Sequence, residues 1–448
     1  MKKMLFVVLG LVLVLPIYAQ KKLSLDEAIS IALQGNTQLI KSKNQLETNK
    51  SQLKNAYGDL LPTLGAQGTW SWQRISDVGG TQRDYLGQIV EVPPSEEQSR
   101  SYSLGVGGNF TLFNGLSNIA NINQKKSNLD AAEFNLDKLK QDIVFQTISY
   151  FYSVLNAQEL MRVRNDNVKY YQKLYETVQE RNRLGSVAKA DVYTAQVQLG
   201  NAELLLIQAQ NAYDASLTTL LNYLSLDVLE DYQLVDPFGG SKTVDTDSYM
   251  KDFSDIASMV SAALDTRFDF RGQELTLKSA ESGITMARSG LLPSLTGNYS
   301  YGTQAVLLDK LFDRKSFNVG LTLSVPIFSN WATENQVQFA QVTYLNAQED
   351  LSALKRQIKI EVKQGYLDLV AAKKSLDVAT KNVTAAEETR KINQERYNLG
   401  SGTILDVLQA DRDYQDAIRN KINATYDFYS RRDNLNNALG KLDFKKYE

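Results

Sequence analysis

Two very long stretches of this sequence contain almost no residue that would interrupt a helix. Residues 116–184 include neither glycine nor proline over 69 positions, and residues 331–399, also 69 positions, include only Gly365. Proline breaks a helix because its ring clashes with the preceding turn and removes a backbone donor, and glycine weakens a helix. The whole chain of 448 residues holds only seven prolines. The two stretches therefore predict two helices of unusual length.

Apolar and small residues recur in both stretches at steps of three and four, as in helices that pack lengthwise against each other. At 1.5 Å per residue each helix would be roughly 100 Å long, many times the usual length in a compact domain. The pattern indicates long antiparallel coiled coils, although a solvated rod would satisfy the helices alone. The recurring residues are Leu129, Ala132, Leu136, Leu139 and Ile143, and then Tyr344, Ala347, Leu351, Leu354 and Ile358.

The two stretches belong to an internal two-fold duplication. The segments 139–143 and 354–358 share a Leu-Lys start and a final Ile at an offset of 215 residues, and Leu-Gly-Ser recurs at 184 and 399 at the same offset. Upstream, Leu-Leu-Pro recurs at 60 and 291, an offset of 231. The difference locates a 16-residue insertion in the first copy. We expect it to be a loop within residues 75–100.

Each copy also predicts shorter elements. Helices are expected at 25–58 and 189–224 in the first copy and at 255–289 and 403–439 in the second, with β-hairpins at 63–113 and 294–328. Ser24, followed three residues later by Glu27, is typical of a helix start. Gly185 and Gly400 are expected to end the long helices. We therefore assign a first repeat, a linker, a second repeat and a tail to residues 20–227, 228–253, 254–440 and 441–448.

The start of the chain has the features of a secretory signal peptide, which we assign to residues 1–19. The pair Lys2-Lys3 is followed by an apolar run over residues 4–17, and the small residue Ala19 precedes a suitable cleavage point. This run is shorter than the roughly 20 residues of a membrane-spanning helix, which makes a retained anchor the lesser alternative. Because no later stretch is comparably apolar, an exported chain would dissolve or enter a membrane as β-strands.

The predicted hairpins alternate apolar and polar residues, the pattern of a strand with two different faces. Residues 317–327 and 102–112 show it over runs long enough for a tilted membrane strand. One apolar and one polar face match a barrel wall between lipid and a polar lumen, and a half-buried soluble sheet is the alternative. Aromatic residues gather here, as at a lipid–water interface. Those we assign to the lipid interface are Trp70, Trp72, Tyr102, Tyr299, Tyr301, Phe317 and Trp331.

Four strands cannot close a membrane barrel by themselves. Bacterial barrels have about eight strands or more, and an open strand edge is not tolerated in lipid. Two, three or four copies of the chain would supply roughly 8, 12 or 16 strands. The sequence thus predicts an α+β membrane protein in which several identical chains share one barrel, while their helices form a hollow tunnel.

The composition excludes much catalytic chemistry. The chain has no histidine and no cysteine, which rules out imidazole and thiol catalysis, disulfides and Cys/His metal sites. It has no phosphate-binding or dinucleotide-binding motif. The formal charge is −2, so no basic excess points to nucleic acid. We predict that the protein is not an enzyme and has no metal, cofactor or nucleic-acid partner.

Seven motifs lie at 23–28, 60–64, 113–115, 291–295, 325–328, 396–401 and 404–408. In their order and spacing they resemble the TolC family of outer membrane efflux proteins. The resemblance covers essentially the whole chain after residue 19. It implies a homotrimer with a 12-stranded transmembrane β-barrel in the outer membrane and an α-helical tunnel in the periplasm. It also implies two partners, a periplasmic adaptor protein and an inner-membrane transporter of the RND, ABC or MFS type.

The function implied by the resemblance is that of the outer-membrane exit duct of a tripartite efflux pump, which conducts expelled substrates passively. Type I protein secretion is the alternative within the same family. A structural coiled-coil fibre or adhesin is the alternative of another class. Such a fibre would explain the long helices but not the four alternating strands.

The resemblance further implies a gate at the periplasmic end of the tunnel. The family's acidic Asp-Val-Leu-Asp pattern reads Asp406-Val407-Leu408-Gln409 here, so three copies of Asp406 would form a cation-attracting ring with half the family's charge. The links that hold the closed state fall on Asp191 and Tyr397, as a carboxylate–phenol hydrogen bond, while the family's arginine position is Gly402. Acidic residues also favour the first turn of any helix, which is the structural alternative for both aspartates.

The turns after the long helices are the expected docking surface for the adaptor. Small residues there would let the helices of a partner approach closely, although glycine also simply ends helices. The residues that we assign to docking are Leu184, Gly185, Ser186, Leu399, Gly400 and Ser401.

Overall fold

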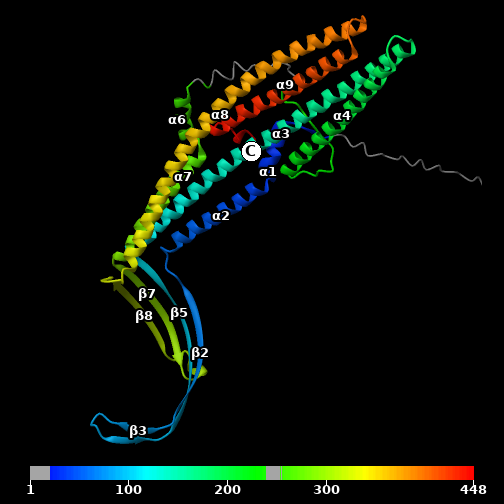
Figure 1. Cartoon of the computed structure of the whole chain (residues 1–448). Helices are drawn as coiled ribbons and strands as arrows, with labels where there is room; N and C mark the ends of the chain where they lie inside the picture. Colours follow the sequence, from blue (N-terminus) through cyan, green and yellow to red (C-terminus); the bar gives the residue numbers. More distant parts are fainter. Residues whose placement is uncertain (1–20, 239–252, 254, 448) are drawn as a thin grey trace, which may run out of the picture. The chain divides into compact units, whose positions relative to one another are not determined.

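The computed structural model describes residues 21–238, 253 and 255–447 (Figure 1). The predicted signal peptide and residues 239–252 of the predicted linker lie outside these described residues. The chain forms two compact units. The first, here called the helical unit, contains the described parts of 1–43, 136–268 and 355–448. The second, here called the strand unit, contains 44–135 and 269–354.

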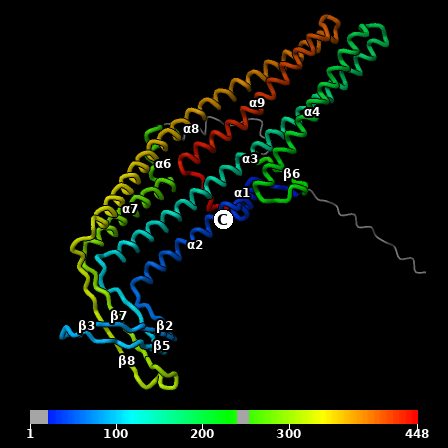
Figure 2. Tube along the Cα trace, turned by 60° about the horizontal axis from the view of Figure 1, so that its bottom comes forward, coloured from blue at the N-terminus to red at the C-terminus, as the bar shows by residue number. Residues whose placement is uncertain are grey.

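Four long helices account for about half of the described residues. α3 (Ser117–Arg183) and α8 (Ala332–Asn398) have 67 residues each, and α4 (Lys189–Tyr223) and α9 (Ile404–Ala438) have 35 residues each. Their bounds lie within one residue of those expected from the sequence. In both views α4 runs beside α3 and α9 beside α8 (Figures 1 and 2).

Glycine ends both of the longest helices. Gly185 follows α3 and Gly400 follows α8, each with a left-handed φ of 76° that other residues rarely adopt. In each case the N–H of the following serine donates to an arginine carbonyl in the last turn, over 2.9 and 2.8 Å. These hydrogen bonds satisfy carbonyl groups that a helix end otherwise leaves unpaired.

The first predicted helix, 25–58, is interrupted once. It forms α1 (Leu25–Gly35) and α2 (Thr37–Gly58), and α1 begins with the expected capping box between Ser24 and Glu27. The break lies at Asn36, whose backbone is extended and whose side-chain oxygen accepts hydrogen bonds from the N–H groups of the next turn at 2.9 and 3.2 Å. Asn36 therefore ends one helix and starts the next, and the prediction of a continuous helix was wrong.

The predicted helix at 255–289 is interrupted in the same way. It forms α6 (Ile256–Thr266) and α7 (Phe268–Arg288), followed by a short 3-10 turn, η1 (Ser289–Leu291). Arg267 lies between α6 and α7 with an extended backbone. Its buried guanidinium forms an ion pair with Glu361 at 2.5 Å and donates to the carbonyl of Ala438 at 3.2 Å. The direction of the chain at this position is therefore set by contacts distant in sequence.

The N-terminal strand and the C-terminal segment are both held by hydrogen bonds within the helical unit. β1 (Lys21–Leu23) pairs in parallel with β6 (Tyr232–Leu234), so part of the predicted linker is a strand. The C-terminal segment, which ends in the 3-10 turn η3 (Lys445–Tyr447), packs against α3. The Gln141 side chain donates to two carbonyl groups of this segment at 3.0 Å each.

The strand unit holds a four-stranded antiparallel sheet in the order β2-β5-β7-β8 (Figure 1). Its strands are β2 (Gly65–Asp77), β5 (Ser95–Asn114), β7 (Ser294–Ala305) and β8 (Lys315–Ser324). A second 3-10 turn, η2 (Leu308–Lys310), lies between β7 and β8. The alternating pattern predicted a strand through Ile327, but β8 ends at Ser324, two residues before a proline that has no backbone donor.

The insertion in the first copy is not the expected loop. β2 and β5 remain paired as far as Asp77 and Ser95, and β3 (Gly80–Arg83) and β4 (Ile89–Val92) form a further antiparallel hairpin. An ion pair between Arg74 and Glu96 at 2.5 Å joins the two extended strands. The glycine and proline pairs within residues 75–100, which favoured a loop, mark the ends of these short strands instead.

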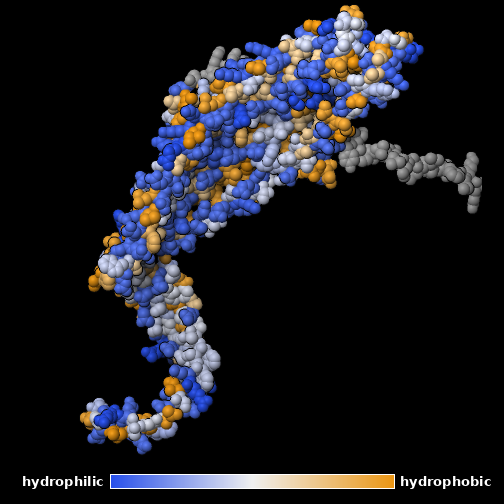
Figure 3. All heavy atoms as spheres, in the orientation of Figure 1, coloured by the Kyte–Doolittle hydropathy of each residue, from blue (hydrophilic) through white to orange (hydrophobic). Residues whose placement is uncertain are grey.

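The described helices are amphipathic rather than uniformly apolar. None of them carries an apolar run long enough to cross a lipid bilayer. In Figure 3 the visible faces of the long helices carry mostly hydrophilic residues.

Gly115→Ala should destabilise the protein more than Gly185→Ala. Both glycines have left-handed φ angles, 64° and 76°, so an added Cβ strains the backbone at either position. At Gly115 the Cβ would also lie 2.6 Å from the backbone oxygen of Ser289, whereas no atom lies within 4 Å of a Cβ at Gly185. We expect losses of about 3 and 1 kcal/mol in the free energy of unfolding. Denaturant unfolding followed by circular dichroism measures both, and equal losses would contradict the close packing at Gly115.

Candidate functional site

The ends of the two helix pairs expose the residues assigned to docking. In the turn after α3, Leu184 is 68% exposed, and in the turn after α8, Leu399 is 81% exposed. Gly185 and Gly400 have no atom within 4 Å of where a Cβ would lie. Each following serine, 186 and 401, is exposed and donates its hydroxyl to an arginine carbonyl of the last helical turn. Both turns are therefore closed by hydrogen bonds and expose a leucine beside two small residues.

Tyr397, one of the predicted gate residues, is buried near the end of α8. Its ring belongs to an apolar cluster, and its hydroxyl is buried without a hydrogen-bond partner. The expected hydrogen bond to Asp191 is therefore not made within the single chain, and its role in holding a closed assembly stays a prediction. Burial raises the pKa of the Tyr397 phenol; Arg181 opposes this shift and Asp191 adds to it. The cluster is formed by Tyr171, Leu174, Val178, Ala195, Ala202, Tyr397, Ile404, Val407 and Leu408.

Arg181 holds Tyr397 from the α3 side. The guanidinium carbon lies 5.0 Å from the centre of the Tyr397 ring, and the same group donates to the Tyr397 backbone carbonyl at 3.3 Å. A cation over an aromatic face is attracted to it. This arginine was not among the predicted site residues, although the pair Glu-Arg recurs at 180 and 395, in the same place of both copies.

Asp406 lies in the first turn of α9 and completes a capping box with Thr403. Its carboxylate accepts hydrogen bonds from the Thr403 N–H at 3.0 Å and hydroxyl at 2.9 Å, and its own N–H donates to the Thr403 hydroxyl at 3.2 Å. The backbone hydrogen bond and then the hydroxyl lower the pKa of Asp406, and the charge of Arg396 adds to the effect. Asp406 is therefore both a helix cap and an exposed, ionised carboxylate.

The surface of α9 that includes Asp406 is polar. Gln409 is exposed and its amide donates to Asp413 at 2.9 Å. Because residues three and four apart share one face of a helix, the three side chains line the same face. The second acidic position of the family pattern is thus an amide that contacts the next carboxylate along the helix.

Gly402, where the resemblance implies an arginine, lies next to the side chain of Arg396 across the turn. A Cβ at Gly402 would lie 3.1 Å from the Cβ of Arg396. The guanidinium of Arg396 donates to the Ser401 carbonyl at 3.5 Å, and its charge acts on Asp406. A positive charge is therefore present at the turn, although it comes from the end of α8.

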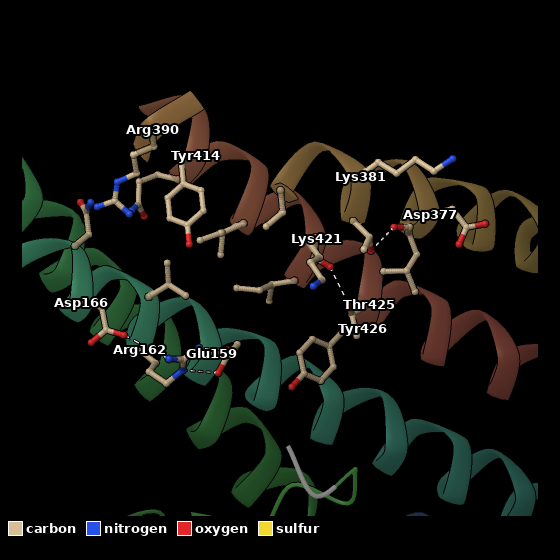
Figure 4. Close-up of a pocket in the computed structure, with 18 of the residues that line it drawn as sticks. Glu159, Arg162, Asp166, Asp377, Lys381, Arg390, Tyr414, Lys421, Thr425 and Tyr426 are labelled. Carbon is tan, nitrogen blue, oxygen red and sulfur yellow. Dashed lines mark hydrogen bonds and ion pairs between the residues drawn. The ribbon is translucent and has the colours of Figure 1, made fainter. Parts of the chain in front are cut away.

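The helical unit also contains a cavity of about 1160 Å³ lined by α3, α8, α9 and Asp236, with both charged and apolar side chains in its walls (Figure 4). On the α3 wall Arg162 forms ion pairs with Glu159 at 2.5 Å and Asp166 at 3.4 Å. Arg390 and Tyr414 lie together at one end of the cavity. Among residues 21–238 and 255–447, no group of three or more acidic side chains is arranged to hold a metal ion.

In the strand unit, the strand aromatics lie on a single face of the sheet. Trp70 pairs with Tyr102 across β2 and β5, and Tyr301 pairs with Phe317 across β7 and β8. The register across β5 and β7 places both pairs on the same face, because directly opposed residues point to the same side. Two residues further along their strands, Trp72 and Tyr299 share that face. Its exposed residues also include Leu104, Val106, Val319, Leu321 and Leu323.

Trp331 lies beyond the sheet, at the start of α8. It is 70% exposed, and its ring meets that of Phe328 edge to face at 6.0 Å. Trp331 follows the Ser324 end of β8, which pairs with the Ser294 end of β7. Trp70 and Trp72 lie toward the opposite end of the sheet, where Tyr102 pairs with Ala305.

Known outer membrane proteins are similar to this chain in sequence and in fold. The family model described as outer membrane efflux protein matches residues 28–225 and 259–441. The chain is 26% identical over 314 residues to outer membrane protein TolC of Vibrio cholerae, covering 68% of each. It is 24% identical over 382 residues to outer membrane protein TolC of Escherichia coli, covering 76% of this chain and 74% of that one. The crystal structure of the outer membrane protein VceC from Vibrio cholerae has the same fold, with a TM-score of 0.78 at 19% identity over 93% of this chain and 96% of that chain.

Thr403→Val should loosen the first turn of α9 and raise the pKa of Asp406 towards its ordinary value of 3.8. The hydroxyl that bonds Asp406 is lost, and a typical N-cap loss changes a helix-end equilibrium roughly fivefold. Because the folded-state pKa of Asp406 is depressed, its stabilising effect is present at neutral pH and disappears as pH falls through that pKa. Amide exchange of residues 404–410 at pH 7 measures the loosening. Thr425→Val, which removes a hydroxyl inside the same helix, is the control and should leave this exchange unchanged.

Proposed function

This chain belongs to the outer membrane efflux protein family, and we propose that it forms the outer-membrane exit duct of a tripartite efflux pump. It resides in the outer membrane and conducts passively what an inner-membrane transporter expels through a periplasmic adaptor. One observation carries the proposal. A single chain combines a four-stranded sheet that has one exposed apolar face with two 67-residue helices that have polar surfaces.

The sheet supports a shared barrel of three chains. Among the described strands, β2 and β8 each pair on one side only. An unpaired edge in lipid leaves backbone groups without partners, so copies of the chain would close the edges against one another, giving 12 strands for three chains. The two repeats, 20–227 and 254–440, would then contribute two strands each.

The aromatic residues support the placement of the sheet in lipid. From the Ser294 end to the Ala305 end, β7 spans about 36 Å at roughly 3.3 Å per residue. Strands tilted by about 40° would cross an apolar layer of about 28 Å over that length. Trp331 would lie near one boundary of this layer and Trp70, Trp72 and Tyr102 near the other. Tyr299, Tyr301 and Phe317 would face lipid between them.

Cysteine pairs across the open edges should link three chains and no more. The chain has no cysteine, so Gln67→Cys on β2 can be combined with Asn318→Cys, Gly320→Cys or Thr322→Cys on β8 without background. All four positions lie on the polar face of the sheet. We expect one combination to give linked dimers and trimers under oxidising conditions, seen as bands in denaturing electrophoresis. Gln67→Cys alone is the control, and bands beyond trimer, or monomer in every combination, would contradict a closed ring of three.

The ends of the helix pairs support a gate and a docking surface. Asp406 is exposed and its pKa is held low by Thr403, so three copies around a narrow opening would present three negative charges. Gln409 would lie beside this ring, and Asp191 and Tyr397 would lie behind it in the first and second copies. The exposed Leu-Gly-Ser turns at 184–186 and 399–401 would receive the adaptor.

Gly185→Trp should abolish efflux while leaving the protein folded and in the outer membrane. A Cβ at this position meets no atom of the chain, so the large side chain would project into the space that a partner occupies. Gly185→Ala imposes the same backbone strain without the bulk, and it should retain most of the efflux. The measurement is the accumulation of a fluorescent cationic dye in cells that carry the variant as their only copy. Normal efflux by Gly185→Trp would exclude docking at this turn. If the parent chain exported a polypeptide but no dye, type I secretion would be favoured instead.

A further inference from the structure

An ion pair with a fully buried carboxylate lies on the side of α9 opposite to Asp406. Asp411 follows Asp406 by five residues, which at 3.6 residues per turn places it about 140° around the helix. Asp406 is exposed, whereas Asp411 has no exposed surface at all. Its carboxylate lies 2.8 Å from the Nε of Arg390, which belongs to α8. The first turns of α9 therefore carry one carboxylate outward and another into the protein.

The buried carboxylate also contacts α3. The side-chain amide of Asn167 donates to Asp411 at 3.1 Å, and both side chains are buried. Burial, followed by the charge and hydrogen bond of Asp411, raises the pKa of the neighbouring Tyr171 phenol. Asp411 is thus in contact with Arg390 of α8 and Asn167 of α3, and its charge acts on Tyr171.

The Arg390 side chain is packed against residues of both α3 and α9. Its guanidinium carbon lies 4.1 Å from the ring centre of Tyr170 on α3 and 4.8 Å from that of Tyr414 on α9. Figure 4 shows Arg390 beside Tyr414 at the end of the cavity. The hydroxyl of Tyr170 in turn donates to Gln394 of α8 at 2.8 Å. The guanidinium is therefore stacked against aromatic rings of two different helices.

Such a cluster admits one arrangement of the three helices. A buried charge that loses its partner is left without water or counter-charge, so slippage or rotation of α9 against α3 is strongly disfavoured. The stacking of the planar guanidinium on Tyr170 and Tyr414 adds direction to the attraction. Because a helix is stiff over five residues, fixing the inner side of this turn also fixes where its outer side points.

We propose that Asp411 and Arg390 are positioning residues that aim the Asp406 side chain into the channel opening. The inference deepens the proposed function and rests on it, since it assigns to this cluster the orientation of the acidic ring. α3 contributes to this positioning through the hydrogen bond from Asn167 to Asp411.

Ion selectivity of the reconstituted channel tests the proposal. The cation-to-anion permeability ratio is measured from the reversal potential in planar bilayers under a salt gradient. Asp406→Ala should lower this ratio, because it removes the ring. Asp411→Asn should lower it as well, by roughly twofold or more, although every Asp406 is still present. Asp427→Asn is the matched control, since it makes the same change on α9 in an exposed ion pair with Arg431, and it should leave the ratio unchanged.

A second variant covers the case in which Asp411→Asn fails to assemble. Asn167→Ala keeps the ion pair and removes only the hydrogen bond from α3, and it should also lower the ratio and speed amide exchange in residues 404–410. A parental ratio in an assembled Asp411→Asn channel, or in Asn167→Ala when the first variant does not assemble, would overturn the positioning role. A parental ratio in Asp406→Ala would remove the ring itself, and the positioning role would be overturned with it.

Discussion

The structure depends on backbone hydrogen bonding that continues through all 67 residues of α3 and of α8. Each residue in a helix must supply an N–H to the preceding turn, which proline cannot do, and the sequence keeps proline out of both segments. A helix of this length is not stable through its hydrogen bonds alone, because most helical stability comes from packing. The fully buried side chains of Phe151, Ile358 and Leu369 provide such packing in the helical unit.

Polar groups define the ends and the mutual register of these helices. Apolar contacts along a coiled coil are tolerant of small shifts, whereas a hydrogen bond or a buried ion pair is satisfied in one position only. The helical unit accordingly places Arg267 with Glu361 at the start of α7 and Arg390 with Asp411 where α8 and α9 meet α3. Both pairs join residues that are distant in sequence, and both involve a side chain with almost no exposure.

Much of the secondary structure could be predicted because it follows local rules. The absence of proline predicted the long helices, and the alternation of apolar and polar residues predicted the four main strands. The breaks at Asn36 and Arg267 escaped prediction because one residue in each case overrides a helical pattern, in the second case through a partner 94 residues away. The insertion was misjudged because glycine and proline pairs mark strand ends as well as loops.

The candidate site could be predicted less fully. Asp406 was identified from the resemblance to a known family, and its capping role follows from its place three residues after Thr403. The contacts of Tyr397 could not be inferred, because the packing of four helix segments decides whether its hydroxyl meets Asp191 or an apolar neighbour. Arg390 and Asp411 were missed for the same reason, since nothing in their local sequence shows that both face α3.

The two ends of the chain's helix pairs differ in how easily they fray. α9 begins after Thr403, whose hydroxyl donates to the Asp406 carboxylate and accepts from the Asp406 N–H. α4 begins after Ala188, which has no side-chain oxygen and makes no side-chain cap. Local opening is cheapest where backbone donors depend on water alone. The first turn of α4 is therefore the softer of the two, so an assembly of such chains would alternate stiff and yielding ends around its rim.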